Sequence, residues 1–137
     1  DKPAQADFEG ITIVDDRFYM VTSWGRVYES FEGEDDDRML YNTYDTGVGK
    51  KCEVEGLTYE PADHALLLLC KNPRVKELED RLAIFEWSLD DRLPVDEPSI
   101  EIPLDRLTDG IDEKDFQPSG IDRNPRRARL TVYPPPR

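Results

Sequence analysis

The most strand-like part of the chain reads Cys-Glu-Val-Glu-Gly-Leu-Thr-Tyr-Glu at residues 52–60, followed by a turn and the apolar run Ala-Leu-Leu-Leu-Leu-Cys at residues 65–70. A second copy, Asp-Phe-Glu-Gly-Ile-Thr-Ile-Val, stands at residues 7–14, ahead of another strand-like stretch at residues 17–23. A third copy, Phe-Gln-Pro-Ser-Gly-Ile, opens at residue 116. Apolar and β-forming runs bounded by turn residues predict β-hairpins. The sequence therefore predicts one hairpin unit that is repeated along the chain.

The spacing of the copies indicates the kind of repeat. They align on Gly10, Gly56 and Gly120, and each glycine is followed by Ile or Leu. The first two glycines lie about 46 residues apart, which suits one four-stranded blade of a β-propeller. The next interval, about 64 residues, requires a blade with an insertion. We therefore predict an all-β fold, a partial β-propeller of about two and a half four-stranded antiparallel blades.

The predicted blades cover residues 7–46, residues 52–103 and residues 115–137, the last being the start of a third blade. Their strands are expected near residues 9–14, 17–23, 26–31 and 39–44, then 53–60, 65–71, 82–89 and 99–102, then 117–122 and 128–133. Apolar residues at helical spacing leave residues 73–87 open to a single amphipathic helix. The β-forming residues of that stretch favour a turn over residues 75–80 followed by a strand. A short helix is expected near residues 104–107.

Two and a half blades leave sheet edges uncovered, and exposed edge strands promote aggregation. Either the chain is part of a longer propeller, or another chain covers its edges. The first explanation is favoured.

The charge of the chain limits the classes of partner. The net charge is −13 over 137 residues, with a pI near 4.4. This balance argues against nucleic acid and anionic membranes, which bind clustered Lys and Arg. It fits a cationic ligand or a divalent metal, or simply an acidic, well-solvated surface. No apolar run reaches the roughly 18–20 residues of a membrane span. The pair of cysteines favours a periplasmic or other extracytoplasmic location.

A polar rim is expected where the inner strands of the blades begin. The first strand of a blade lines the central channel, so Glu9 and Glu55 would meet near its mouth. Converging carboxylates are what calcium requires, since it takes six to eight oxygen ligands. Alternatively, Glu55 pairs with Lys71 across the hairpin. The other side chains expected at this rim are those of Ser23, Trp24, Lys71, Asn72, Gln117 and Ser119.

Cys52 and Cys70 flank the central hairpin and are candidates for a disulfide. If Glu60 faces Ala65, strict register places Cys70 opposite Glu55, which is too far from Cys52 for a bond. A bulge or a curled strand start would bring the two thiols together, so a disulfide and two free thiols both remain open. The single histidine, His64, lies in the turn at the far end of the hairpin. A Ser-His-Asp or Cys-His arrangement at the rim is therefore not expected.

The strings at residues 52–59 and 66–71 resemble bacterial six-bladed propellers of the SdiA-regulated (YjiK-like) family. The opening at residues 7–12 looks like the first blade of that family, and residues 116–121 are similar to a later blade start. The resemblance implies six blades, of which this chain would supply about half. The remaining blades, or another chain, would then cover the sheet edges.

A more distant resemblance is to calcium-dependent gluconolactonases, whose first blade carries Glu-Gly with the Glu as a metal ligand. It implies a calcium ligand at Glu9, but this chain has Ser119 where those enzymes place an Asn. We expect a non-catalytic ligand-binding or structural propeller, with a small molecule or protein at the channel mouth and calcium within it. The alternative is a calcium-dependent hydrolase, of lactonase or phosphoesterase type, that uses Glu9 and Glu55.

Overall fold

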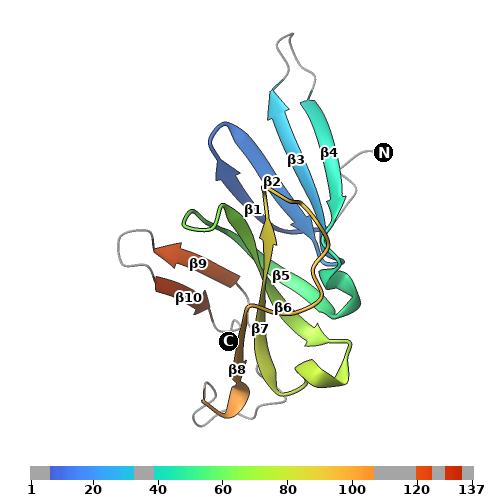
Figure 1. The fold of residues 1–137 in the computed structure, drawn as a ribbon, viewed down its shortest axis with the longest axis vertical. Helices are drawn as coiled ribbons and strands as arrows, with labels where there is room; N and C mark the ends of the chain where they lie inside the picture. Colours follow the sequence, from blue (N-terminus) through green and yellow to red (C-terminus); the bar gives the residue numbers. More distant parts are fainter. Residues whose placement is uncertain (1–6, 33–38, 107–119, 125–128, 134–137) are drawn as a thin grey trace.

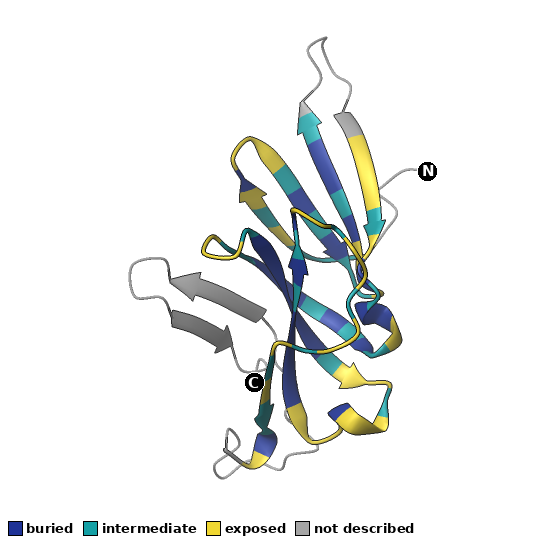
Figure 2. Cartoon of the chain, in the orientation of Figure 1, coloured by how far each residue is buried: buried dark blue, intermediate teal, exposed yellow. Residues whose placement is uncertain are grey.

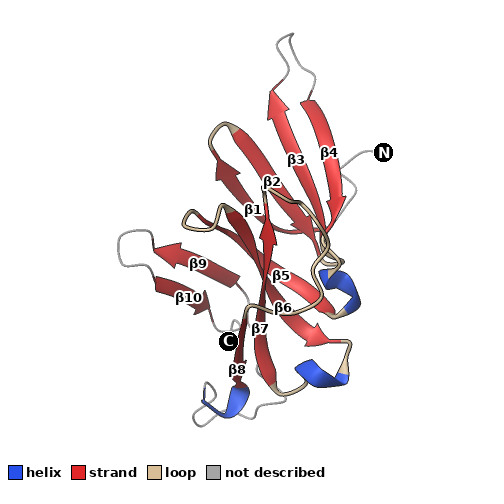
Figure 3. Ribbon diagram, in the orientation of Figure 1, coloured by secondary structure: helices blue, strands red, loops and turns tan. Residues whose placement is uncertain are grey.

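The computed structural model describes the backbone of residues 7–32, 39–106, 120–124 and 129–133, and the side chains of residues 7–31 and 41–105. In this part of the chain the protein is all-β, as predicted, with short 3₁₀ turns as its helical structure. Two four-stranded antiparallel sheets follow one another in the chain, and a two-stranded sheet comes after them (Figures 1 and 3).

Sheet 1 has the strand order β1-β2-β3-β4. Its strands are β1 (Phe8–Val14), β2 (Arg17–Thr22), β3 (Arg26–Glu32) and β4 (Met39–Asp45). Tight turns connect the first three strands, with Asp15 at φ 58° and Gly25 at φ 80° in the left-handed region. Asp tolerates this region and Gly favours it, which is why such residues occur in the turns of the hairpins.

Sheet 2 repeats the simple up-and-down order, β5-β6-β7-β8. Its strands are β5 (Cys52–Glu60), β6 (Ala65–Pro73), β7 (Arg81–Ser88) and β8 (Ile100–Pro103), and the smaller sheet pairs β9 (Gly120–Asn124) with β10 (Arg129–Tyr133). The strands of the two larger sheets begin and end within two residues of the predicted bounds. The short 3₁₀ turns are η2 (Val48–Lys50), η3 (Lys76–Leu78) and η4 (Leu104–Arg106). A helix over residues 73–87 is therefore wrong, whereas the turn before β7 and the short helix after β8 are confirmed.

The two sheets meet through their first strands. Strand β1 lies against β5, and β5 in turn lies against β9. Gly10 makes the first approach possible, because a Cβ atom at that position would lie 2.9 Å from the Cβ atom of Leu57. The Val54 N–H group also donates a hydrogen bond to the Ser23 carbonyl oxygen across the gap, at 2.8 Å.

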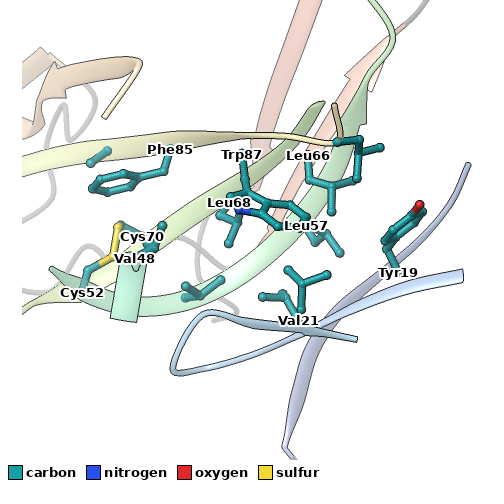
Figure 4. Close-up of a cluster of buried hydrophobic side chains, with 14 of the residues drawn as sticks. Tyr19, Val21, Val48, Cys52, Leu57, Leu66, Leu68, Cys70, Phe85 and Trp87 are labelled. Carbon is teal, nitrogen blue, oxygen red and sulfur yellow. A yellow bond between two sulfur atoms is a disulfide. The ribbon is translucent and has the colours of Figure 1, made fainter. Parts of the chain in front are cut away.

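The main core fills the space between sheets 1 and 2 (Figure 4). Sheet 1 contributes Val14, Tyr19, Val21 and Val27, and sheet 2 contributes Leu57, Leu66, Leu68, Phe85 and Trp87. A second buried cluster on the other face of sheet 2 includes Leu67, Leu69, Leu82 and Ile84. Residues 65–70 of strand β6 are therefore buried on both faces (Figure 2), which explains their unbroken apolar sequence.

A buried carboxylate also joins the sheets. Glu29 of β3 is 1% exposed, and Arg92, from the segment between β7 and β8, contacts both of its oxygens at 3.0 and 2.9 Å. Tyr19, Asn42 and Arg17 donate further hydrogen bonds to it, at 2.6, 3.1 and 2.9 Å. Burial alone would raise the pKa of Glu29, but these donors outweigh burial and hold that pKa well below its usual range.

A β-bulge decides the cysteine pairing. Residues of β5 and β6 pair in strict register from Glu60↔Ala65 to Gly56↔Leu69, and then Val54, not Glu55, pairs with Cys70. Of the two arrangements that the sequence left open, strict register and a bulge, the bulge is therefore the one observed. The register shifts again between Cys52 and Glu53. With both shifts, the Cα atoms of Cys52 and Cys70 lie 5.6 Å apart, and the two residues form a disulfide (Figure 4). The disulfide candidate is confirmed.

We expect the Cys52→Ala/Cys70→Ala double variant to lose about 3 kcal/mol of unfolding free energy. The disulfide joins residues 18 positions apart, and without it the unfolded chain gains the conformational entropy of that loop. Urea unfolding measures this loss. Dithiothreitol should destabilise the parent by a similar amount and leave the double variant unchanged. Two titratable thiols in the denatured, unreduced parent would contradict the disulfide.

Substitution Glu29→Gln should lower the free energy of unfolding by about 3 kcal/mol or more, because it leaves a partly buried arginine without its countercharge. Glu101→Gln is a matched control, since Glu101 forms a half-exposed ion pair with Arg81 at 3.6 Å and should cost less than about 1 kcal/mol. Equal losses in the two variants, measured by urea unfolding, would show that Glu29 is not a structural anchor.

Candidate functional site

Two glutamates sit at corresponding β-bulges in the neighbouring strands β1 and β5. In β1 the register shifts between Phe8 and Gly10, which makes Glu9 the extra residue. In β5 it shifts between Val54 and Gly56, which makes Glu55 the extra residue. Bulges redirect side chains and are common next to functional sites. Because β1 lies against β5, the two bulges define one polar rim.

Lys71 of β6 supplies the positive charge of this rim. Its Nζ atom lies 2.9 Å from Oε1 of Glu55, and the two side chains are 22% and 20% exposed. The hydrogen bond to Glu55 raises the pKa of Lys71 against the opposing effect of burial, and the charges of Glu55, Glu53 and Glu9 add to the increase. The predicted pairing of Glu55 with Lys71 is thus confirmed.

Glu9 completes the cluster. Burial is the largest cause of its raised pKa, the negative charge of Glu55 is the next, and Lys71 acts in the opposite direction. The ammonium group of Lys71 thus contacts Glu55, and the negative charges of Glu9 and Glu53 are close enough to act on its pKa. The cluster keeps an excess of negative charge, so it can accept a further cation or retain a proton.

The other predicted rim residues have different environments. Asn72 donates a hydrogen bond to Oε1 of Glu53, at 2.6 Å, and Ser23 takes part through its carbonyl oxygen, which accepts from Val54. Trp24 is 63% exposed, and the guanidinium group of Arg74 lies 3.7 Å from the centre of its ring. Gln117 and Ser119 lie outside the described residues.

Two residues of this region, Glu53 and Arg74, are not among those that the sequence predicted. Glu53 stands two residues before Glu55, so the alternating pattern Cys-Glu-Val-Glu did carry a signal for it. Arg74 comes just after β6, and its guanidinium donates to the carbonyl oxygens of Gly49 and Cys52 at 2.8 and 2.7 Å. Nothing local in the sequence indicates those contacts.

The far end of the β5–β6 hairpin holds a separate set of titratable groups. His64 lies in the turn, as predicted, and its Nδ1 atom is 2.9 Å from Oδ1 of Asp90. A hydrogen bond with Asp63, followed by burial, raises the pKa of Glu86 to about 7. These groups belong to the opposite end of the strands from Glu55, so they do not contribute to the rim.

Within the described residues no group of three or more His, Cys, Asp or Glu side chains is placed to hold a metal ion. The described part of the chain also contains no helix that is long and apolar enough to cross a membrane. Comparisons with protein-family models, with curated proteins and with solved structures find no match.

The pKa of Glu9 depends on the nearby charges of Glu55 and Lys71, so it tests the placement of these side chains. We expect Glu55→Gln to lower this pKa, because a nearby negative charge disappears and Lys71 is released from its partner. Lys71→Met should raise it further. Carboxyl-carbon NMR titration measures both shifts. Because folding raises the pKa, Glu9 stabilises the fold at low pH and this contribution is lost as the pH rises through the folded-state value.

A pKa of Glu9 that is the same in the parent and in both variants would contradict the placement of the three side chains. Glu97→Gln, at an exposed position outside the rim, serves as the control and should leave the titration of Glu9 unchanged.

Proposed function

We propose that this chain is part of a β-propeller of the SdiA-regulated (YjiK-like) kind, and that the rim of Glu9, Glu55 and Lys71 is its non-catalytic ligand site. The observation that carries the proposal is the pair of bulges at Glu9 and Glu55. Each lies in the first strand of a four-stranded sheet, just before a glycine, and the two strands are neighbours. Successive blades around an axis would place equivalent side chains in this way.

The exposed face of sheet 1 supports the same proposal. Ile11 and Ile13 of β1 are both 60% exposed. The residues at the same distance from the bulge in β5 are Leu57 and Tyr59, which pack into the core between the sheets. A further sheet on the open side of sheet 1 would bury the two isoleucines as sheet 1 buries Leu57 and Tyr59. The rest of a ring would supply such a sheet.

The charges of the rim favour a cationic ligand. Lys71 pairs with Glu55, and Glu9 and Glu53 add negative charge nearby, so an amine or a calcium ion would compete with Lys71 at this rim. We propose calcium as the metal for this position, with the rest of its six to eight oxygens supplied by residues outside the described set or by water.

The protonation state of Lys71 at the rim fits a site that binds a ligand without catalysis. The raised pKa of Lys71 keeps it an ammonium ion at neutral pH, which is unsuitable for a nucleophile or a base. One observation favours the alternative, a calcium-dependent hydrolase acting on a lactone or a phosphate ester. The raised pKa of Glu9 is what a general acid requires.

Thermal unfolding with calcium and with a chelator tests the proposal. Calcium at ten times its dissociation constant should stabilise the parent by about 1.4 kcal/mol, which corresponds to a rise in Tm of roughly 5 °C. Glu9→Gln and Glu55→Gln should each abolish the rise, whereas the exposed control Glu97→Gln should keep it.

A parent protein without any calcium-dependent shift would contradict the cation site. Hydrolysis of lactones or phosphate esters that is lost in Glu9→Gln would contradict a non-catalytic rim and would support the hydrolase instead.

A further inference from the structure

A cavity of about 260 Å³ lies at the ends of strands β2, β3 and β4 beside η2. Its lining residues are Thr22, Trp24, Arg26, Asp45, Gly49 and Lys50. Trp24 was expected at the rim, but neither it nor any other lining residue is one of the three charged residues Glu9, Glu55 and Lys71, so the proposed function does not depend on this cavity. It combines an exposed aromatic ring with two cations, one carboxylate and one hydroxyl group.

The aromatic ring of Trp24 is held in place although 63% of the residue is exposed. The turn that carries it is closed by a hydrogen bond from the Gly25 N–H group to the Thr22 carbonyl oxygen, at 3.0 Å. Arg74 stacks 3.7 Å from the ring centre and is itself fixed by two carbonyl oxygens. Glycine is required at position 49, because a Cβ atom there would overlap the Trp24 carbonyl group. A fixed, exposed aromatic ring binds a ligand with little loss of side-chain entropy.

The charge of the cavity contrasts with that of the whole chain. The chain carries a net charge of −13, yet Arg26 and Lys50 both line this small space. Neither residue forms an ion pair with another of the residues whose side chains the structure describes. Together with the single carboxylate of Asp45, the two cations leave these lining residues with an excess of positive charge that attracts an anionic group, and the guanidinium fork of Arg matches a carboxylate in geometry.

Asp45 narrows the choice of anion. It lies directly opposite Arg26 in the β3–β4 ladder, and its Oδ1 atom accepts a hydrogen bond from the Gly47 N–H group at 2.9 Å, which fixes the carboxylate. A carboxylate repels a doubly charged phosphate group but accepts hydrogen bonds from hydroxyl groups. The ligand should thus carry one negative charge together with hydroxyl groups.

We propose that this cavity binds an acidic sugar, a hexuronate or the end of a uronate-containing oligosaccharide. The apolar face of the sugar ring lies on Trp24, its carboxylate faces Arg26 and Lys50, and its hydroxyl groups donate to Asp45. The volume is close to the lower limit of small-molecule sites, which suits one sugar ring and not a larger cofactor.

Titration with D-galacturonate tests the proposal through tryptophan fluorescence and amide NMR. The chain has two tryptophans, and Trp87 is fully buried, so the change in fluorescence should come from Trp24 and disappear in Trp24→Phe. We expect saturation in the millimolar range, with shifts of the amide signals of Asp45 and Lys50. Arg26→Gln should weaken the affinity about tenfold, which is the loss of one charged hydrogen-bonding partner.

Lys76→Gln is the matched control for lost positive charge, because Lys76 is exposed in η3 and should leave the affinity unchanged. Galactose, which lacks the carboxylate, should bind at least about tenfold more weakly than galacturonate. Equal affinity for galactose, tighter binding of inorganic phosphate or AMP, or unchanged amide signals at about 50 mM galacturonate would each overturn the proposal. Far-UV circular dichroism confirms that each variant is folded.

Discussion

Two β-bulges, at Glu9 and Glu55, underlie the disulfide, the polar rim and the contact between the two sheets. Each adds one residue to the first strand of its sheet and shifts the ladder by one step. In β5 the shift pairs Cys70 with Val54, so that the disulfide to Cys52 can form. It also leaves Glu55 free of a direct cross-strand partner, so that its carboxylate reaches Lys71. The glycine after the first bulge, Gly10, lets β1 approach β5 closely.

The interface between the sheets combines a large apolar core with one buried ionic contact. The apolar core provides most of the driving force, because the large side chains of both sheets are removed from water there. Glu29 and Arg92 add little net stability as a pair, since both are desolvated, but either one alone is costly. Their contact therefore fixes how the segment after β7 lies against sheet 1. In the same segment, the Val95 N–H group donates to the Thr46 carbonyl oxygen at 2.8 Å.

The sequence predicts the strands well, because alternation, apolar runs and turn residues are local signals. It leaves the bulge at Glu55 open, because the residue types between the two cysteines allow both strict register and a one-residue shift. The contact between Arg92 and Glu29 joins residues 63 positions apart, and neither stands in a motif. At the rim, the residue types predicted Glu9, Glu55 and Lys71 as neighbours of opposite charge. Which of them pair, and which keep a raised pKa, depends on burial and on Glu53.

The packing of β1 against β5 is the arrangement from which we infer that the two sheets are neighbouring blades, and NMR measures it directly. Nuclear Overhauser contacts between the Hα protons of Gly10 and the side chain of Leu57 should be strong, since a Cβ atom at position 10 would lie 2.9 Å from that of Leu57. The cross-strand pair Tyr59↔Leu66 provides an internal reference within sheet 2. If the reference contacts are observed and those between Gly10 and Leu57 are absent, the sheets do not meet as described and the rim does not exist.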